Sequence, residues 1–130
     1  MANVANAPFG QVLPRQLGLI GRGTSSEDAA RITAHLLRVD PQTVQTMVGS
    51  AQQHSAWELL PRIDVPVLIV AGDLDPFAPS ERVGVAMHAQ CPTSELLRLP
   101  HGTHTALLDH ADIIGDAVND FLIRRVVGVT

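Results

Sequence analysis

One segment, residues 65–71 (Val-Pro-Val-Leu-Ile-Val-Ala), restricts the possible folds of this chain more than any other. An unbroken apolar run of this kind cannot present a wet face, so it predicts a strand buried on both sides in a parallel sheet. A second strand is expected over residues 94–99. Between the two, an apolar helical face is formed by Val83, Ala86 and Met87. A strand, a helix and a strand of these lengths predict a right-handed parallel crossover and therefore an α/β fold.

Each predicted strand is followed by a loop that carries ionisable residues. The first loop contains Asp73 and Asp75, and the second contains His101 and His104. The carboxyl ends of neighbouring parallel strands lie at the same edge of a sheet, where ligands bind in open α/β folds. A functional site is therefore expected where these two loops meet.

Both loops resemble those of the α/β-hydrolase fold family. The family's Gly-x-x-Asp-x-x-x-Pro pattern after the acid strand is matched by Gly72, Asp75 and Pro79. Its Gly-Thr-His motif, followed by an apolar pair and an acid, is matched over residues 102–109, and the order of acid before histidine also agrees. The resemblance runs from about residue 60 to residue 126. It implies that Asp75 and His104 are the acid and the histidine of a Ser-Asp-His triad.

The resemblance also implies an activity: hydrolysis of a carboxylic ester or a similar small acyl substrate, with no cofactor and no metal. The nucleophile is missing, however, because no Gly-x-Ser-x-Gly turn occurs in the 130 residues. We therefore expect a partial α/β-hydrolase fold, the C-terminal portion of a larger enzyme. Residues 1–60 would form an irregular lead-in and a helical cap segment, and residues 61–130 the C-terminal part of the hydrolase domain. Such a chain should be inactive alone, since it lacks the nucleophile and the oxyanion donors.

Several helices are predicted around this centre. The capping-box spacing of Thr24 and Glu27 predicts a helix over residues 26–38. Asp40 and Pro41 are typical of a helix start, and the next helix has an apolar stripe that periodicity places in the core. This stripe consists of Val44, Met47, Val48 and Ala51. A short turn over residues 54–61 is expected to dock on the sheet through Trp57, and a terminal helix over residues 112–126 is expected to cover the sheet.

Two residues compete for the catalytic roles. Asp73 is the alternative acid, but an Asp directly after Gly72 is more typical of a side chain that caps its own turn. His101 is the alternative base, but only His104 occupies the family's Gly-Thr-His position. Asp75 and His104 therefore remain the predicted pair.

A metal site is the other chemistry that this region suggests. His101, His104, Asp109 and His110 are possible zinc ligands, but structural zinc sites usually include cysteines. The single cysteine, Cys91, ends a helix just before a proline and has no evident base beside it, so it is not expected to be a nucleophile.

The charge and hydropathy of the chain restrict its partners. A net charge of -4, with 9 unclustered Lys and Arg residues, does not favour binding to nucleic acid or to an anionic membrane. No apolar run approaches the roughly 20 residues of a membrane helix, and the first residues lack the pattern of a secretion signal. One cysteine fits a reducing compartment, so a cytoplasmic location is expected.

One edge of the predicted strand over residues 65–71 lacks a partner in this sequence, which favours self-association or docking to an N-terminal half. A small-molecule substrate is expected only for the completed enzyme. Two alternatives stay open: a non-catalytic remnant or interaction module that uses this edge, and an independent α/β binding domain whose loops match the family by chance. The last alternative predicts no hydrogen bond between Asp75 and His104.

Overall fold

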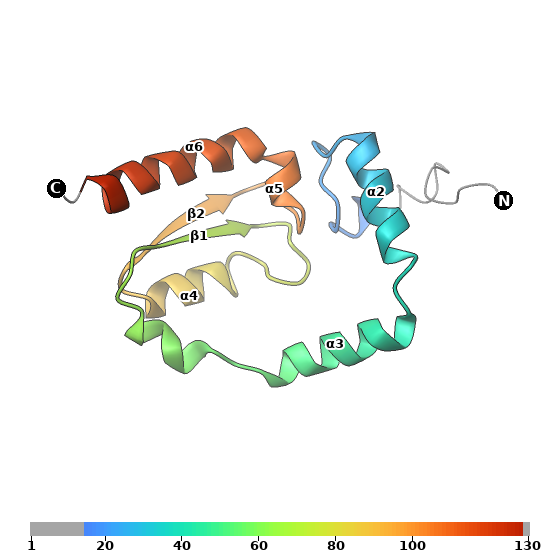
Figure 1. Cartoon of the computed structure of the whole chain (residues 1–130), viewed down its shortest axis with the longest axis horizontal. Coiled ribbons are helices and arrows are strands. Elements are labelled where there is room, and N and C mark those ends of the chain that lie inside the picture. The colour runs from blue at the N-terminus through green and yellow to red at the C-terminus, as the bar shows by residue number, and fades with distance from the viewer. Residues whose placement is uncertain (1–14, 129–130) are drawn as a thin grey trace.

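The computed structural model describes residues 15–128. Within these residues two strands and a series of helices follow one another along the chain (Figure 1). The elements are α2 (Ser26–Leu36), α3 (Pro41–Gln53), the 3₁₀-helix η2 (Trp57–Arg62), β1 (Val67–Gly72), α4 (Gly84–Gln90), β2 (Ser94–Leu99), α5 (Ala106–Asp109), α6 (Ala111–Leu122) and the π-helical turn η3 (Ile123–Val127). The first 14 residues of the predicted lead-in lie outside the described residues.

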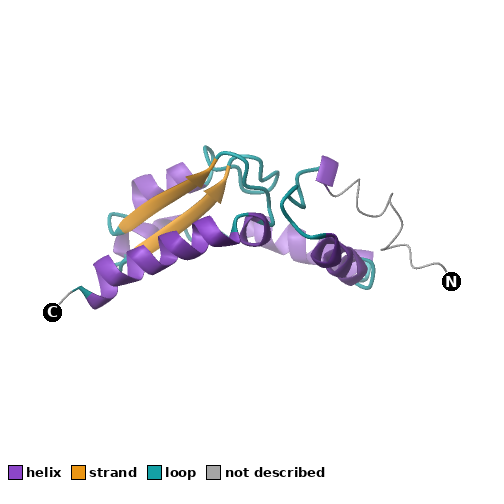
Figure 2. Ribbon diagram, turned by 90° about the horizontal axis from the view of Figure 1, so that it is seen from above, coloured by secondary structure: helices purple, strands orange, loops and turns teal. Residues whose placement is uncertain are grey.

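The centre of the fold is the parallel pair β1 and β2. Their register runs from Val67 opposite Ser94 to Gly72 opposite Leu99, and α4 makes the crossover between them. In Figure 1 the two strands lie between α6 and α4, and Figure 2 shows the same strands from above. The predicted α/β class and the parallel crossover are confirmed.

Apolar residues from both strands and from the flanking helices form the core. The buried apolar residues are Ile20, Ala29, Leu60, Ile69, Ala71, Cys91, Leu99, Ile114 and Phe121. The prediction that β1 is buried on both sides is only partly correct, because Val67, Leu68 and Val70 are half-buried. The reason is that, within residues 15–128, β2 is the one strand that pairs with β1.

An ion-pair cluster fastens α6 and η3 to β2. The Arg124 guanidinium donates to both carboxylate oxygens of Glu95, at 3.1 and 2.8 Å, and to Asp120 at 2.8 Å. The hydrogen bonds from Arg124 lower the pKa of Glu95. The predicted terminal helix is thus observed as α6 with η3, and it buries Ile114 and Phe121.

The two N-terminal helices begin at side-chain caps. The α3 cap is Asp40, as predicted, and its carboxylate accepts from the Thr43 amide at 2.9 Å. The α2 cap is Ser25, which accepts from the Asp28 amide at 3.0 Å, so the prediction that placed the capping box at Thr24 is wrong by one residue. The Thr24 hydroxyl has a different partner, described below.

The apolar stripe of α3 is not buried in this chain. Met47 is 65% exposed, and Val44 and Val48 are also exposed, so the predicted core packing of this face is wrong for the described residues. Trp57 is likewise exposed, and Leu60 of the same 3₁₀-helix is the residue that packs inward. Periodicity identified the apolar face correctly, but it cannot identify the surface that would cover it.

Among the described residues, none of the helices combines the length and the apolar character needed to cross a bilayer.

Candidate active site

The loops after β1 and β2 touch each other through two glycines. The Leu74 amide donates to the Gly102 carbonyl at 2.9 Å, and the Asp73 amide donates to the Leu99 carbonyl at 3.0 Å. A Cβ atom added to Gly72 would overlap the backbone carbonyl of Gly102. The close approach of the two loops therefore leaves no room for a side chain at Gly72 or Gly102.

This approach brings Asp75 and His104 together. The His104 Nδ1 lies 3.1 Å from Asp75 Oδ2, as the resemblance implied. The other carboxylate oxygen, Asp75 Oδ1, accepts from the amides of Phe77 at 2.8 Å and Ala78 at 3.0 Å. These amide bonds fix the carboxylate, so its free oxygen faces the imidazole. The hydrogen bond contradicts the alternative in which the two loops match by chance.

Besides Asp75, two further groups contact His104. Its backbone amide donates to the Gly18 carbonyl at 3.3 Å, and the Phe77 ring meets it edge-on with centroids 4.9 Å apart. The side chain is 52% exposed. Within residues 15–128 no hydroxyl or thiol group is hydrogen-bonded to its Nε2.

The charge of Asp75 determines the tautomer of His104. Partial burial of the carboxyl group opposes its ionisation, but the hydrogen bonds from Ala78, His104 and Phe77 outweigh this effect and lower the pKa of Asp75. An ionised carboxylate can only accept, so Nδ1 carries the proton that lies between them. In the neutral ring the lone pair then lies on Nε2, which is the arrangement that a general base requires.

The lowered pKa of Asp75 predicts an acid-sensitive fold. Its contribution to stability is complete above the unfolded pKa of about 4 and is lost as the pH falls through the lower folded value. We expect the melting temperature to fall as the pH drops below about 4, and less steeply in Asp75→Asn. Asp116→Asn, an exposed change on α6, is the control for loss of one carboxyl group. Identical pH profiles for Asp75→Asn and the unsubstituted chain would contradict the assignment; thermal melts by circular dichroism measure them.

Asp73, the alternative acid, faces away from His104. Its carboxylate accepts from the Ser80 hydroxyl and from the Arg98 guanidinium, the latter at 3.0 Å. These bonds lower the pKa of Asp73. The prediction that Asp73 caps its own turn is wrong: Asp75 accepts the turn amides, and Asp73 instead forms an ion pair with β2.

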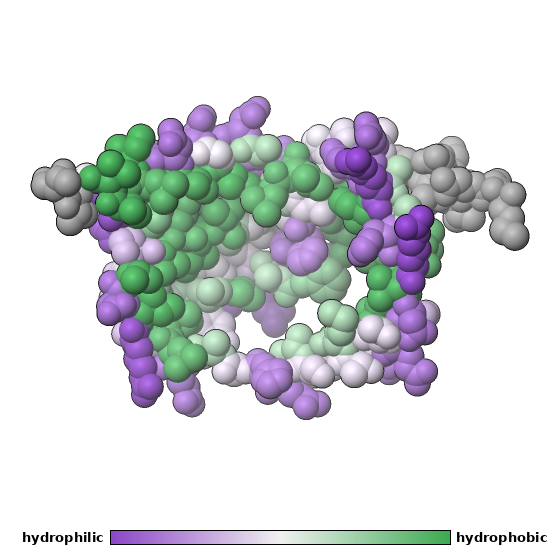
Figure 3. Space-filling view, viewed as in Figure 1, coloured by the Kyte–Doolittle hydropathy of each residue, from purple (hydrophilic) through white to green (hydrophobic). Residues whose placement is uncertain are grey.

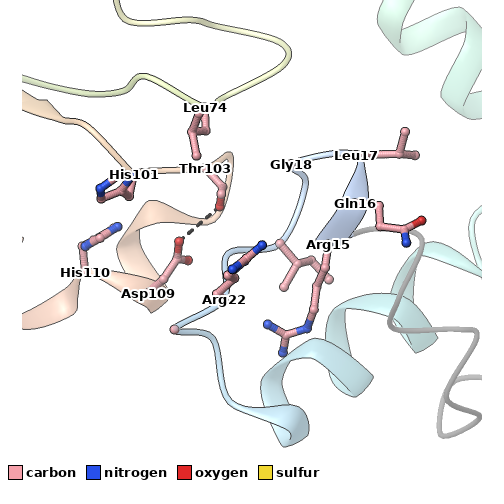
Figure 4. A pocket seen from close by; sticks show the side chains of 12 residues that line it. Arg15, Gln16, Leu17, Gly18, Arg22, Leu74, His101, Thr103, Asp109 and His110 are labelled. Carbon is pink, nitrogen blue, oxygen red and sulfur yellow. Dashed lines mark hydrogen bonds between the residues drawn. The ribbon is translucent and has the colours of Figure 1, made fainter.

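The two other histidines near this loop, His101 and His110, have a different environment from His104. His101 and His110 line a cavity of about 730 Å³, together with Asp109 and Arg22 (Figure 4). Among the residues that the structure describes, no group of three or more His, Cys, Asp or Glu side chains is placed to hold a metal ion. Cys91 is buried.

Sequence reasoning missed one polar cluster next to His104. The Asp109 carboxylate accepts from three threonine hydroxyls, those of Thr24, Thr103 and Thr105. Two of these threonines, Thr103 and Thr105, flank His104 in the sequence. This Thr-His-Thr triplet was the one local sign of the cluster. The third is 85 residues away along the chain, and no local pattern connects it to this loop.

A groove follows the unpaired edge of β1 and ends at the acid and the histidine. It has a volume of about 450 Å³, and its walls come from β1, from α4 and from the His104 loop. The apolar side chains that line it include Leu68, Val70, Met87 and Ile114. Figure 3 shows hydrophobic residues gathered over this part of the molecule.

Comparison with known proteins agrees with this architecture. The sequence model of the family described as TAP-like protein, an α/β-hydrolase family, matches residues 38–126. Because this match covers more than half of the chain and includes both loops, the chain belongs to the α/β-hydrolase family.

Individual curated relatives in this fold family have different names. It is 32% identical over 108 residues to a pimeloyl-[acyl-carrier protein] methyl ester esterase of Neisseria meningitidis (strain MC58), an alignment that covers 82% of this chain and 42% of the relative. It is 38% identical over 63 residues to a putative non-heme chloroperoxidase of Synechocystis, covering 48% of this chain and 23% of that protein. A putative 2-succinyl-6-hydroxy-2,4-cyclohexadiene-1-carboxylate synthase of Bacillus subtilis is 30% identical over 77 residues, or 59% of this chain and 27% of the relative. The chain thus spans less than half the length of these relatives. No solved structure gave a significant match.

Proposed function

We propose that this chain supplies the acid and the general base of a serine-type hydrolase that acts on a carboxylic ester or a similar small acyl substrate. The observation that carries the proposal is the hydrogen bond of 3.1 Å between His104 Nδ1 and Asp75 Oδ2, at the ends of two adjacent parallel strands. The name of the Neisseria relative, a methyl ester esterase, supports the ester class.

In the proposed reaction a hydroxyl nucleophile attacks the acyl carbon and gives its proton to Nε2 of His104. Asp75 stays ionised and stabilises the imidazolium that forms. The imidazolium then protonates the leaving alcohol, and the same pair activates the water that releases the acid product. The nucleophile and the oxyanion donors belong to a segment that the sequence of this chain does not provide.

We propose that the completing segment pairs with β1 along the groove at its unpaired edge. In a parallel pair, alternate residues direct their peptide groups to opposite sides. The amides of Val67 and Asp73 donate toward β2, so the peptide groups of Leu68 and Val70 face the groove. An apolar strand parallel to β1 would satisfy these groups, bury the groove, and end beside His104.

The same edge supports a second candidate function, an interaction module or non-catalytic remnant that binds another strand or a second copy of the chain. Such a module needs the edge but has no need of a fixed acid and histidine pair. The proposed location remains the cytoplasm, which rests on the single cysteine.

A chimaera tests the proposed function. The matched 42% of the Neisseria esterase is replaced by this chain, and hydrolysis of a p-nitrophenyl ester is measured beside the isolated chain. We expect turnover by the chimaera and the background rate for the isolated chain, because the acid and the base alone lack the electrostatic stabilisation of the transition state. A folded chimaera without activity would favour the interaction module.

A further inference from the structure

The carboxylate of Asp109 lies at the meeting point of two segments that are distant in sequence. Asp109 Oδ1 accepts from Thr24 Oγ1 at 3.0 Å and from Thr105 Oγ1 at 3.1 Å, and Oδ2 accepts from Thr103 Oγ1 at 3.2 Å. Figure 4 shows the side chains of Asp109 and Thr103 joined in this way. Thr24 and Thr103 are both buried.

In this cluster the Asp109 carboxylate oxygens act only as acceptors. Each threonine hydroxyl has one proton, and each donates it to the carboxylate. The Thr103 oxygen then accepts from the Thr105 amide at 3.3 Å, and the Thr105 oxygen accepts from the Gly21 amide at 3.2 Å. Carboxylate acceptors make stronger hydrogen bonds than neutral ones, so one side chain orders both segments.

Two glycines of the segment ahead of α2 pack directly against Asp109. A Cβ atom added to Gly21 would overlap the Asp109 carboxylate, and one added to Gly23 would lie 2.8 Å from the Asp109 carbonyl oxygen. Both glycines therefore allow the segment ahead of α2 to lie directly against the end of α5, just before α6 begins.

We propose that Asp109 is a positioning residue, whose carboxylate fastens Thr103 and Thr105, the two neighbours of His104, to Thr24 ahead of α2. This latch fixes the His104 loop on one side, while Asp75 holds the imidazole on the other. The histidine loop and the segment over residues 18–24 then move as one unit. The role of His104 as a base rests on the proposed function, whereas the latch itself does not.

Hydrogen exchange followed by NMR tests the latch in the chain as it is. In Asp109→Asn we expect the amides of Gly21, His104 and Thr105 to exchange about tenfold faster or more, because these amides are protected by the ordered loop. The Ile69 amide in β1 should keep its rate, and so should all amides in the control Asp116→Asn. Unchanged rates at His104, or an equal increase throughout the chain, would overturn the proposal.

A milder pair of variants serves if Asp109→Asn does not fold. Thr24→Val removes one donor with little change in shape, and Thr24→Ser keeps the hydroxyl. We expect faster exchange at His104 in Thr24→Val and the original rate in Thr24→Ser. Equal rates in the two variants would show that the Thr24 hydroxyl does not act on the loop and would overturn the latch.

The pKa of the Asp75 carboxyl group, measured by NMR, reports on positioning more directly. His104 is one of the groups that lower this pKa. We expect Asp109→Asn to raise it in the same direction as His104→Ala, and Asp116→Asn to leave it unchanged. No movement in Asp109→Asn would overturn the positioning role. If exchange and pKa behave as expected but the chimaera is inactive, the proposed function fails and the latch remains.

Discussion

His104→Ala in the chimaera should lower kcat for ester hydrolysis by about 10⁶-fold, because removing the base of such a triad disables the whole triad and leaves only the contributions of binding and of the oxyanion donors. The imidazole of His104 is the group that Asp75 orients, and its Nε2 is left to receive the nucleophile's proton. Asp75→Asn should cost roughly 10³- to 10⁴-fold, since the ring then loses the partner that selects its tautomer. Steady-state kinetics with a p-nitrophenyl ester measure both changes.

His101→Ala is the matched control for this experiment. His101 belongs to the same loop but lines the separate cavity beside His110, so its loss should leave kcat within about twofold, as expected for a surface change away from the chemistry. An active chimaera in which His104→Ala and His101→Ala behave alike would refute the assignment of His104 as the base. Circular dichroism of each variant shows whether the fold is retained.

Gly72→Ala should destabilise the chain by about 2–4 kcal/mol, which is at or above the usual cost of overpacking. The added methyl group would meet the backbone of Gly102, and a backbone cannot yield as the end of a flexible side chain can. The loops after β1 and β2 would have to separate, and Asp75 would move away from His104. Denaturant unfolding measures the free energy, and the NMR titration of Asp75 reports on the pair.

Gly115→Ala is the corresponding control. Gly115 lies within α6, and an added Cβ meets nothing within 4 Å. The change should stabilise the chain by about 0.5–1 kcal/mol through helix propensity alone. If both substitutions stabilise the chain, or if Gly72→Ala has no effect, the close approach of the two loops is not the constraint described above.

Much of the central fold could be predicted because its signals are local. The apolar run of β1, the crossover length, and the Asp40 cap each depend on neighbouring residues, and all three are observed. The pair of Asp75 and His104 was also brought together as expected, because adjacent parallel strands place their following loops at one edge. The catalytic role of the pair stays a prediction until kinetic measurements are made.

The errors in prediction arise where the contacts of a residue are distant in sequence or are not encoded in its local pattern. Thr24 and Glu27 have the spacing of a capping box, but the Thr24 hydroxyl donates to the distant Asp109 carboxylate. The N-terminus of α2 is capped by Ser25 instead. Asp73 was expected to cap its turn, but it pairs with Arg98 on the neighbouring strand, and Asp75 accepts the turn amides in addition to pairing with His104. Met47 lies on the predicted apolar stripe of α3 but is exposed and not buried. Periodicity identifies an apolar face, but it contains no information about which surface covers that face.

The exposed position of α3 has a consequence for how such a protein can diversify. This helix begins at its own Asp40 cap, and its side chains are largely free of the strands that hold Asp75 and His104. Substitutions on its exposed face should therefore leave the hydrogen bond between Asp75 and His104 in place. The pairing of Asp75 with His104 and the sequence of α3 are therefore structurally independent of each other in the part of the chain that the structure describes.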